Sequence, residues 1–280
     1  MENRGVLRRA VTVSTALRPF LGSAAGADGV VLSVYRSAVN LLVAGELVTL
    51  ASARGGGLPN GVLLADSFEP VALGVRSGMA VAASARRLDI PGGLLHVDLV
   101  APQWDPLLRP SHVPADIGGR VAVARGALAG GTLIAGGRLT DGGLAPAARK
   151  RRDSAIELAG TGLIGLGPGL TPSGDDVLVG FTAGLSAIGD PRARRLARAW
   201  AGAATGRTTD VAVAFHRAAA RGFYAERLHV VARALLAGPV EAIPEAIRLA
   251  AAWGATSGSD TLAGFLLALD TATQRRAVAA

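Results

Sequence analysis

The chain has 280 residues, of which 50% are hydrophobic, and it contains no cysteine. This length is enough for one large domain or two ordinary ones with a sizeable core. The lack of cysteine excludes disulfides, thiolate metal sites and cysteine nucleophiles. The formal net charge of +8 comes almost wholly from arginine and favours anionic partners. Since Lys150 is the sole lysine, neither a lysine Schiff base nor a Walker-type phosphate loop is expected.

The first 145 residues are predicted to form a β-rich domain, a small barrel-like sheet. Residues 1 to about 28 are expected to be a helix-forming or loosely ordered lead-in. Segments rich in β-branched and apolar residues predict strands at 30–35, 46–50 and 62–65, and alternation predicts another at 95–99. Residues 71–83 fit a strand or a helix, 101–114 form a proline-rich loop, and 121–124 fit a strand or the start of a short helix. Residues 130–143 are interrupted by glycines, and no Gly-x-Gly-x-x-Gly pattern supports a dinucleotide site.

Residues 146–280 are predicted to form an all-α domain, which makes the whole chain an α+β protein. An amphipathic helix is expected at 192–204 with its arginines outside, ended by Gly206. Thr208, Thr209 or Asp210 is expected to cap the next helix, and further helices are expected at 223–237 and 243–253. The basic run 149–152 favours a solvated helix face over a nucleic-acid patch, because no aromatic residues interleave with it.

The segment 165–185 is the most informative part of the chain. Its first half, Gly-Leu-Gly-Pro-Gly-Leu-Thr-Pro, is a loop, since Pro168 and Pro172 cannot lie inside a helix. Its second half is apolar with small residues at helical spacing, so a helix is expected to begin at or after Thr171. Ser173 followed three residues later by Asp176 is typical of a helix cap.

The same pattern returns 84 residues later. Residues 173–181, Ser-Gly-Asp-Asp-Val-Leu-Val-Gly-Phe, match residues 257–265, Ser-Gly-Ser-Asp-Thr-Leu-Ala-Gly-Phe, at six positions. We therefore expect two equivalent helices that pack through their glycine faces, with neighbouring N-termini. Helix N-termini carry unpaired N–H groups and a partial positive charge, which favour anions.

Two interpretations of this repeat remain open. The Ser and Asp residues are either simple caps, worth about 1 kcal/mol each, or parts of a functional site. The second acid, Asp175, and the glycines of the preceding loop favour a site, because neither is needed for capping. The candidate catalytic residues are Asp175, Asp176 and Asp260. The candidate substrate- or anion-binding residues are Gly167, Gly169, Thr171, Ser173, Gly174, Arg207, Thr208, Ser257 and Gly258.

The metal content and the location of the protein are also predicted from residue patterns. The four histidines are scattered without zinc-ligand spacing, but Asp175 and Asp176 leave a magnesium ion open, since magnesium needs few protein ligands. Residues 1–21 lack the apolar block of a secretory signal, and no stretch approaches ~20 uninterrupted apolar residues. A cytoplasmic protein without a membrane association is therefore expected.

The loop Gly-Leu-Gly-Pro-Gly-Leu-Thr-Pro-Ser-Gly-Asp-Asp at 165–176 resembles the signature of one bacterial family. The run Thr-Ser-Gly-Ser-Asp-Thr-Leu-Ala-Gly at 256–264 is similar to its second block. Weaker similarities lie in Val-Tyr-Arg-Ser-Ala-Val-Asn at 34–40 and in Pro59-Asn60. That family, long catalogued as a domain of unknown function, includes the third subunit of the oxamate carbamoyltransferase of allantoin fermentation.

The resemblance implies membership in a multisubunit transferase complex of purine catabolism. Such a complex exchanges a carbamoyl group between phosphate and an oxamate-like acceptor, so the implied partners are small anions and other subunits. The roles left open for Asp175 and Asp176 are metal ligand, general base or lock on the loop. Arg207 is expected to grip a carboxylate or phosphate. A non-catalytic assembly or anion-binding subunit is the alternative, and nucleic-acid binding is a weaker one.

Overall fold

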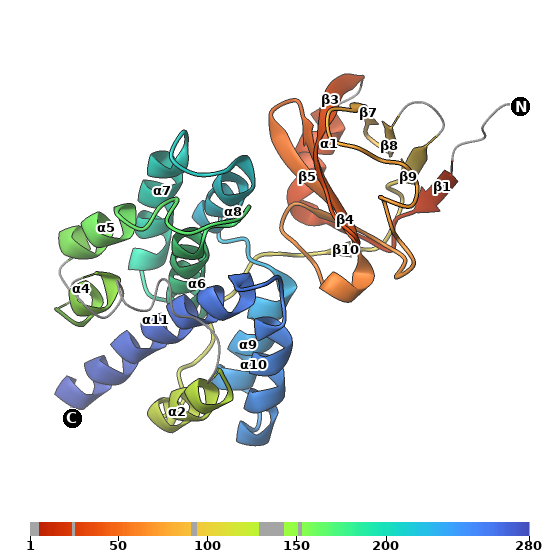
Figure 1. The fold of residues 1–280 in the computed structure, drawn as a ribbon. Helices are drawn as coiled ribbons and strands as arrows, with labels where there is room; N and C mark the ends of the chain where they lie inside the picture. The colour runs from red at the N-terminus through yellow and green to blue at the C-terminus, as the bar shows by residue number, and fades with distance from the viewer. Residues whose placement is uncertain (1–5, 24–25, 91–93, 129–142, 151–152, 280) are drawn as a thin grey trace, which may run out of the picture. The chain divides into compact units, whose positions relative to one another are not determined.

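The computed structural model describes residues 6–23, 26–90, 94–128, 143–150 and 153–279. The chain divides into two compact units, Met1–Pro106 and Leu107–Ala280. The first is built on a sheet and the second is mainly helical, which agrees with the expected α+β class (Figure 1). The predicted domains, 1–145 and 146–280, put helix α2 (Ile117–Leu128) in the first domain, whereas contacts place it in the second unit.

The sheet of the first unit is curled into a half-barrel, with ten strands among the described residues. Their order across the sheet is β1-β9-β8-β7-β3-β4-β5-β6-β2-β10. Three neighbouring pairs, β1 with β9, β10 with β2 and β5 with β6, run parallel, and the others run antiparallel. The strands are β1 Val6–Arg9, β2 Thr12–Ser14, β3 Ala27–Val34, β4 Ala38–Val43, β5 Glu46–Ser52, β6 Gly61–Leu64, β7 Ala80–Ser84, β8 Arg87–Ile90, β9 Leu95–Asp98 and β10 Gln103–Trp104.

Alternation along the central strands decides which face of the sheet carries the core. Val39 and Leu41 of β4 are fully buried in one apolar cluster, together with Val48 and Leu50 of β5. Residues between them point to the opposite face, because successive side chains of a strand alternate. Asn40 is one of these residues, which explains how an asparagine fits into an otherwise apolar strand.

The expectation of a helix-forming or loosely ordered N-terminal lead-in was correct only for its two short helices and missed two strands. Residues 6–23 form the strands β1 and β2, the short 3-10 helix η1 (Thr15–Leu17) and the short helix α1 (Arg18–Ser23). Val6 of β1 pairs with Leu95, and Val13 of β2 pairs with Val62. Because these partners lie far along the chain, the local pattern gave no sign of the strands. The short helix η2 (Ala53–Gly55) follows β5.

The second unit consists of helices around the pair α6 and α11, which lie side by side in Figure 1. Most predicted helices are confirmed within a few residues, and α7 has the predicted bounds. Arg192 at its start is buried beside Asp190, so the expectation that all its arginines lie outside was wrong. The described helices after α2 are α4 Leu144–Lys150, α5 Asp153–Thr161, α6 Ser173–Ala187, α7 Arg192–Ala204, α8 Asp210–Ala220, α9 Glu226–Leu236, η3 Val240–Ala242, α10 Ile243–Ala251 and α11 Ser257–Ala279.

The contact between α6 and α11 is reciprocal and is made by glycines. A Cβ built on Gly180 would overlap the carbonyl oxygen of Thr261, and one built on Gly264 would overlap the carbonyl oxygen of Val177. Gly180 and Val177 of the first copy correspond to Gly264 and Thr261 of the second copy, so the two contacts are equivalent. The helices are therefore related by a local pseudo-two-fold, as the repeat predicted. Only a residue without a side chain lets the two backbones approach so closely.

We expect Gly180→Ala to lower the free energy of unfolding by about 3 kcal/mol, because the added methyl meets backbone that cannot move aside. Urea unfolding followed by tryptophan fluorescence measures this change. Gly202→Ala is the matched control in α7, since a Cβ there meets no atom within 4 Å. It should raise stability by up to about 1 kcal/mol, through helix propensity alone. Equal effects of the two substitutions would contradict the close backbone approach.

Candidate functional site: two buried acids between paired helix starts

The helix cap expected at Ser173 is not what the structure contains. Pro172 occupies the cap position of α6, and no side chain caps the helix. Instead, the Ser173 hydroxyl acts on the carboxyl group of Asp260 on the other helix and lowers its pKa. Likewise the hydroxyl of Ser257, at the start of α11, lowers the pKa of Asp176 of α6. Each serine thus interacts with the acid of the opposite copy of the repeat, and the two helix starts form one cluster.

Threonines complete the surroundings of the two acids. The Thr171 hydroxyl lowers the pKa of Asp176, and its Oγ1 lies 2.8 Å from Oγ of Ser257. The Thr256 hydroxyl lowers the pKa of Asp260. Asp176 and Asp260 are only 6% and 1% exposed, and Oδ2 of each is buried with no hydrogen-bond partner among the described residues. An unsatisfied buried carboxyl oxygen is costly, so its presence on both helices is the feature that most needs explanation.

Burial changes the protonation of both acids. Desolvation raises the pKa of Asp176 from 3.8 to about 8, opposed in part by the hydroxyls of Ser257 and Thr171. The negative charges of Asp260 and Asp175 raise it further. Desolvation also raises the pKa of Asp260, against hydrogen bonds from Ser173 and Thr256. At pH 7, Asp176 is therefore mainly a neutral carboxylic acid and can donate a hydrogen bond.

Asp175 has different surroundings from its neighbour. Its Oδ2 accepts hydrogen bonds from the Gly165 amide at 3.1 Å and from Thr208 Oγ1 at 2.6 Å. Its Oδ1 lies 2.8 Å from Nε2 of the buried His216 on α8. Asp175 thereby joins the signature loop to the start of α8. Of the three roles left open for Asp175, this arrangement favours that of holding the signature loop in place.

The sequence analysis did not include His216 in the site. It is 1% exposed, and a histidine so deeply buried needs a polar partner. One signal was present in the sequence, namely a histidine on the apolar side of a helix that follows the Thr208-Thr209 cap. Thr209 was correctly among the three expected caps, since its Oγ1 accepts a hydrogen bond from the Ala212 amide at 3.1 Å.

The amides at the two helix starts make hydrogen bonds inside the protein, and the binding role predicted for the glycines stays a prediction. The Gly174 amide donates to the carbonyl of Leu166 at 2.8 Å, and the Gly258 amide donates to the carbonyl of Trp253 at 2.9 Å. Both amides are therefore already used inside the protein. Gly167 (φ +114°) lies against the Ser173 amide, while Gly169 (φ +99°) is exposed and open.

Arg207 is exposed, and its hydrogen-bond partner is a backbone carbonyl rather than either of the two acids. Its guanidinium donates to the carbonyl of Thr161 at 3.0 Å, and its own carbonyl packs against Gly165. The role of Arg207 as an anion ligand stays a prediction. Among the described residues, no three His, Asp or Glu side chains gather in a way that would hold a metal ion. A magnesium ion held by one or two carboxylates likewise stays a prediction.

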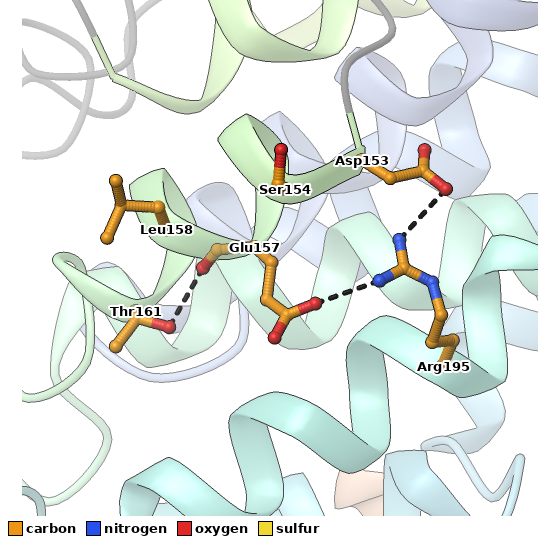
Figure 2. A pocket seen from close by; sticks show the side chains of 6 residues that line it. All are labelled: Asp153, Ser154, Glu157, Leu158, Thr161 and Arg195. Atoms are coloured by element: carbon orange, nitrogen blue, oxygen red, sulfur yellow. Dashed lines mark hydrogen bonds and ion pairs between the residues drawn. The ribbon is translucent and has the colours of Figure 1, made fainter.

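An open surface pocket of about 810 Å³ lies elsewhere, between α5 and α7 (Figure 2). It contains none of the predicted site residues. Among the described residues that line it, Arg195 is the one cation, and both Asp153 (3.0 Å) and Glu157 (2.8 Å) form ion pairs with it. Its lining residues are Asp153, Ser154, Glu157, Leu158, Thr161 and Arg195.

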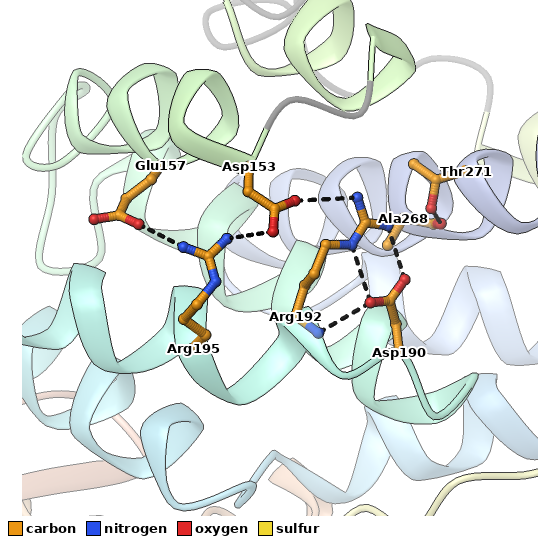
Figure 3. Close-up of polar contacts among 7 residues, drawn as sticks. All are labelled: Asp153, Glu157, Asp190, Arg192, Arg195, Ala268 and Thr271. Carbon is orange, nitrogen blue, oxygen red and sulfur yellow. Dashed lines mark hydrogen bonds and ion pairs between the residues drawn. The ribbon is translucent and has the colours of Figure 1, made fainter.

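The polar contacts behind this pocket continue into the helix core. Figure 3 shows Arg192 bound by Asp190 at 2.8 Å and facing Asp153 at 3.9 Å, which ties α5 to the start of α7. Thr271 of α11 closes a hydrogen bond to the carbonyl of Ala268 at 2.7 Å. The Arg192–Asp153 contact joins two helices, whereas the Thr271 hydrogen bond lies within α11. Of the basic run 149–152, residues 151 and 152 lie outside the described residues, as do 129–142 of the glycine-interrupted stretch.

The first unit holds a polar network at the two weaker sequence blocks. The Asn60 side-chain amide donates to Thr49 Oγ1 at 3.0 Å, and Thr49 Oγ1 donates to Asn40 Oδ1 at 2.7 Å. Asn40 Nδ2 in turn donates to Ser33 Oγ at 3.0 Å. Asn40 and Asn60 therefore act together, and they join β3, β4 and β5 to the turn before β6.

The sheet, the helical unit and the reciprocal acid pair define an α+β protein with an internally repeated helix at its candidate site. Family comparison agrees: residues 9–103 match the AllH family N-terminal domain, and residues 163–269 match the oxamate carbamoyltransferase subunit AllH. The chain belongs to the AllH family, as the resemblance of its signatures indicated. Comparisons with curated proteins and with solved structures give no match. None of the described helices has the length and apolarity needed to cross a membrane.

We expect His216→Ala to lower the free energy of unfolding by about 3 kcal/mol, because it leaves the buried Asp175 without its Oδ1 partner. Chemical denaturation of the full chain measures the loss. His216→Gln is the matched variant, since its amide can still donate toward Asp175, and it should lose clearly less. A loss of the same size in both variants would show that packing of the ring, and not the polar contact, matters here.

The raised pKa of Asp176 makes the stability of the protein depend on pH. Its carboxyl group stays protonated in the folded chain up to about pH 8 but ionises near 3.8 when unfolded. The folded state thus binds more protons between these values, so stability falls as pH rises from about 4 to about 8. Asp176→Asn should remove much of this fall. Thermal melting across pH 4–9 tests the difference; parallel curves for the two proteins would contradict it.

Proposed function

We propose that this chain supplies the small-substrate site of an oxamate carbamoyltransferase-type complex. The site lies between the starts of α6 and α11, at residues 167–176 and 257–260. The observation that carries the proposal is the pair of unpartnered, buried carboxyl oxygens, Oδ2 of Asp176 and Oδ2 of Asp260. Unsatisfied buried oxygens on both halves of a repeat lower the stability of the folded protein, and hydrogen bonds from a bound ligand would offset that loss.

The chemistry of the cluster suits a small, planar acid amide such as oxamate. Its carboxylate needs a hydrogen-bond donor, and the neutral Asp176 provides one. Its amide nitrogen needs an acceptor, and the carboxyl group of Asp260 provides one. Transfer of a carbamoyl group depends on positioning and on stabilising developing charge, so no protein nucleophile is required.

The signature loop closes one side of this site. Asp175 is its lock, because it holds Gly165 and Thr208 together through a single carboxylate oxygen. Thr209 adds a hydrogen bond to the carbonyl of Leu170. The exposed Gly169 lies at the open part of the loop, where a substrate can pass. The other subunits that the family name implies would complete the site or deliver the carbamoyl donor.

A non-catalytic assembly subunit is the alternative, and one observation favours it. The close glycine contacts make α6 and α11 the structural centre of the helical unit, a role that needs no ligand. On this alternative, the acids would only fix the register of the two helices. Ligands would then leave the stability of the chain unchanged, and substitutions would lower stability and complex activity together.

Thermal shift of the purified chain separates the two functions. We expect oxamate or carbamoyl phosphate to raise the melting temperature; at ~100 times its dissociation constant a ligand adds about 2.7 kcal/mol of stability. Asp176→Ala should abolish the shift and lower the activity of the assembled complex at least about 100-fold. Asp210→Asn, an exposed acid at the start of α8, is the control and should change neither. Ligand shifts of equal size in wild type and Asp176→Ala would place the binding site elsewhere.

A further inference from the structure

The two helix starts of the repeat are held by equivalent backbone hydrogen bonds. In the first copy the Gly174 amide donates to the carbonyl of Leu166 at 2.8 Å, and in the second the Gly258 amide donates to the carbonyl of Trp253 at 2.9 Å. Each glycine is the second residue of its helix. The carbonyl that precedes each helix therefore helps to place the first residue of that helix, which is a serine in both copies.

The side chains that fix the two helix starts differ between the copies. In the first copy, Asp175 accepts a hydrogen bond from Thr208 at 2.6 Å and lies 2.8 Å from Nε2 of His216. The second copy has Ser259 at the position of Asp175. A serine is shorter than an aspartate and carries no charge, so α11 needs a different anchor.

Trp253, which lies between α10 and α11, has such an anchor in its ring. The ring of Phe215 on α8 meets the indole edge-on, with centroids 6.1 Å apart and an interplanar angle of 82°. The guanidinium of Arg227 on α9 lies 4.3 Å from the centroid of the indole ring. Edge-to-face rings and a cation over a ring face are both attractive arrangements. Two helices, α8 and α9, therefore hold the indole.

The surroundings of Arg227 strengthen its contact with the indole. Burial lowers the pKa of Arg227 to about 10, opposed by the charge of Glu226. The guanidinium still carries its charge at pH 7. A cation over an aromatic ring is held more tightly where water is excluded, so this contact is worth more than one on the open surface.

Helix α8 reaches both copies of the repeat through two consecutive residues. Phe215 contacts Trp253 ahead of α11, and His216 contacts Asp175 at the start of α6. One helix thus braces both helix starts, by an aromatic contact on one side and a polar contact on the other.

We propose that Trp253, held by Phe215 and Arg227, is a positioning residue that sets the start of α11 against the signature loop. It acts through its backbone carbonyl, which holds the second residue of α11. It thereby places Ser257, whose Oγ lies 2.8 Å from Oγ1 of Thr171 in that loop. This inference rests on the proposed function, because the substrate is bound between the two helix starts. The indole stack affects substrate binding without touching the substrate.

Amide hydrogen exchange of the full chain, followed by NMR, tests the positioning without any substrate. Arg227→Met removes the cation but keeps an unbranched side chain, so we expect the Gly258 amide to exchange about fivefold faster. The Gly174 amide should keep its rate and is the internal control. Arg227→Lys keeps a cation for the indole and should restore most of the protection. Arg221→Met is the matched control, since it removes the cation 4.6 Å from the ring of Phe223, and it should change neither rate.

Two outcomes of the exchange experiment would overturn the proposal. An unchanged rate for the Gly258 amide in Arg227→Met would show that the stack does not hold the start of α11. Equal acceleration of the Gly174 and Gly258 amides would show a general loss of stability in place of a local effect on one helix start.

Kinetics of the assembled complex test whether the positioning serves the substrate. We expect Arg227→Met to raise KM for oxamate about fivefold with little change in kcat, because it weakens binding in the ground state and the transition state alike. Arg227→Lys should restore KM, and Arg221→Met should leave it unchanged. A purely structural role would instead reduce the amount of active complex, which lowers the apparent kcat and leaves KM as it is.

The ligand response of the wild-type chain separates this inference from the proposed function. If oxamate stabilises the wild type and Arg227→Met leaves KM unchanged, the positioning role fails and the proposed function stands. If no ligand stabilises the wild type, the proposed function fails and the role in substrate binding fails with it.

Discussion

The close approach of α6 and α11 is the constraint on which the rest of the helical unit depends. Gly180 and Gly264 let each backbone touch a carbonyl of the other helix. At that separation the residues one turn before them, Asp176 and Asp260, necessarily lie at the same buried junction. Two acids therefore meet in the interior because of the glycines, and larger residues at these positions would separate the helices and expose the acids to water.

Burying two acids at a helix crossing creates an electrostatic problem that hydroxyls solve only in part. Serine and threonine hydroxyls can donate one hydrogen bond each, and they lower the pKa of the acid they contact without adding positive charge. An arginine would have neutralised the negative charge, as Arg192 neutralises that of Asp190 beyond the other end of α6. With hydroxyls as its partners, Asp176 instead keeps a pKa raised to about 8.

The sequence was sufficient for the features that depend on local chemistry. The prolines of the signature loop predicted where α6 begins, and the spacing of the two Ser-Gly-x-Asp segments predicted the paired helices. The sequence was insufficient for features whose partners lie far along the chain. Strands β1 and β2 exist because Leu95 and Val62 pair with them, and His216 belongs to the site because Asp175 needs a buried partner. Ser173 fits the capping pattern, yet the opposite helix offers its hydroxyl an acid that no local rule reveals.

The two halves of the repeat are not equivalent, and the difference decides how the cluster works. The first copy carries Asp175 where the second carries Ser259, and only the first places an added negative charge beside its acid. Asp176 also belongs to the copy of the repeat in which Asp175 joins the loop to Thr208 and to His216 of α8, and these contacts hold its position. In exact symmetry the two acids would have the same pKa. The divergence at a single position instead adds the charge of Asp175 to the causes that raise the pKa of Asp176, so the two ends of an otherwise symmetric junction differ chemically.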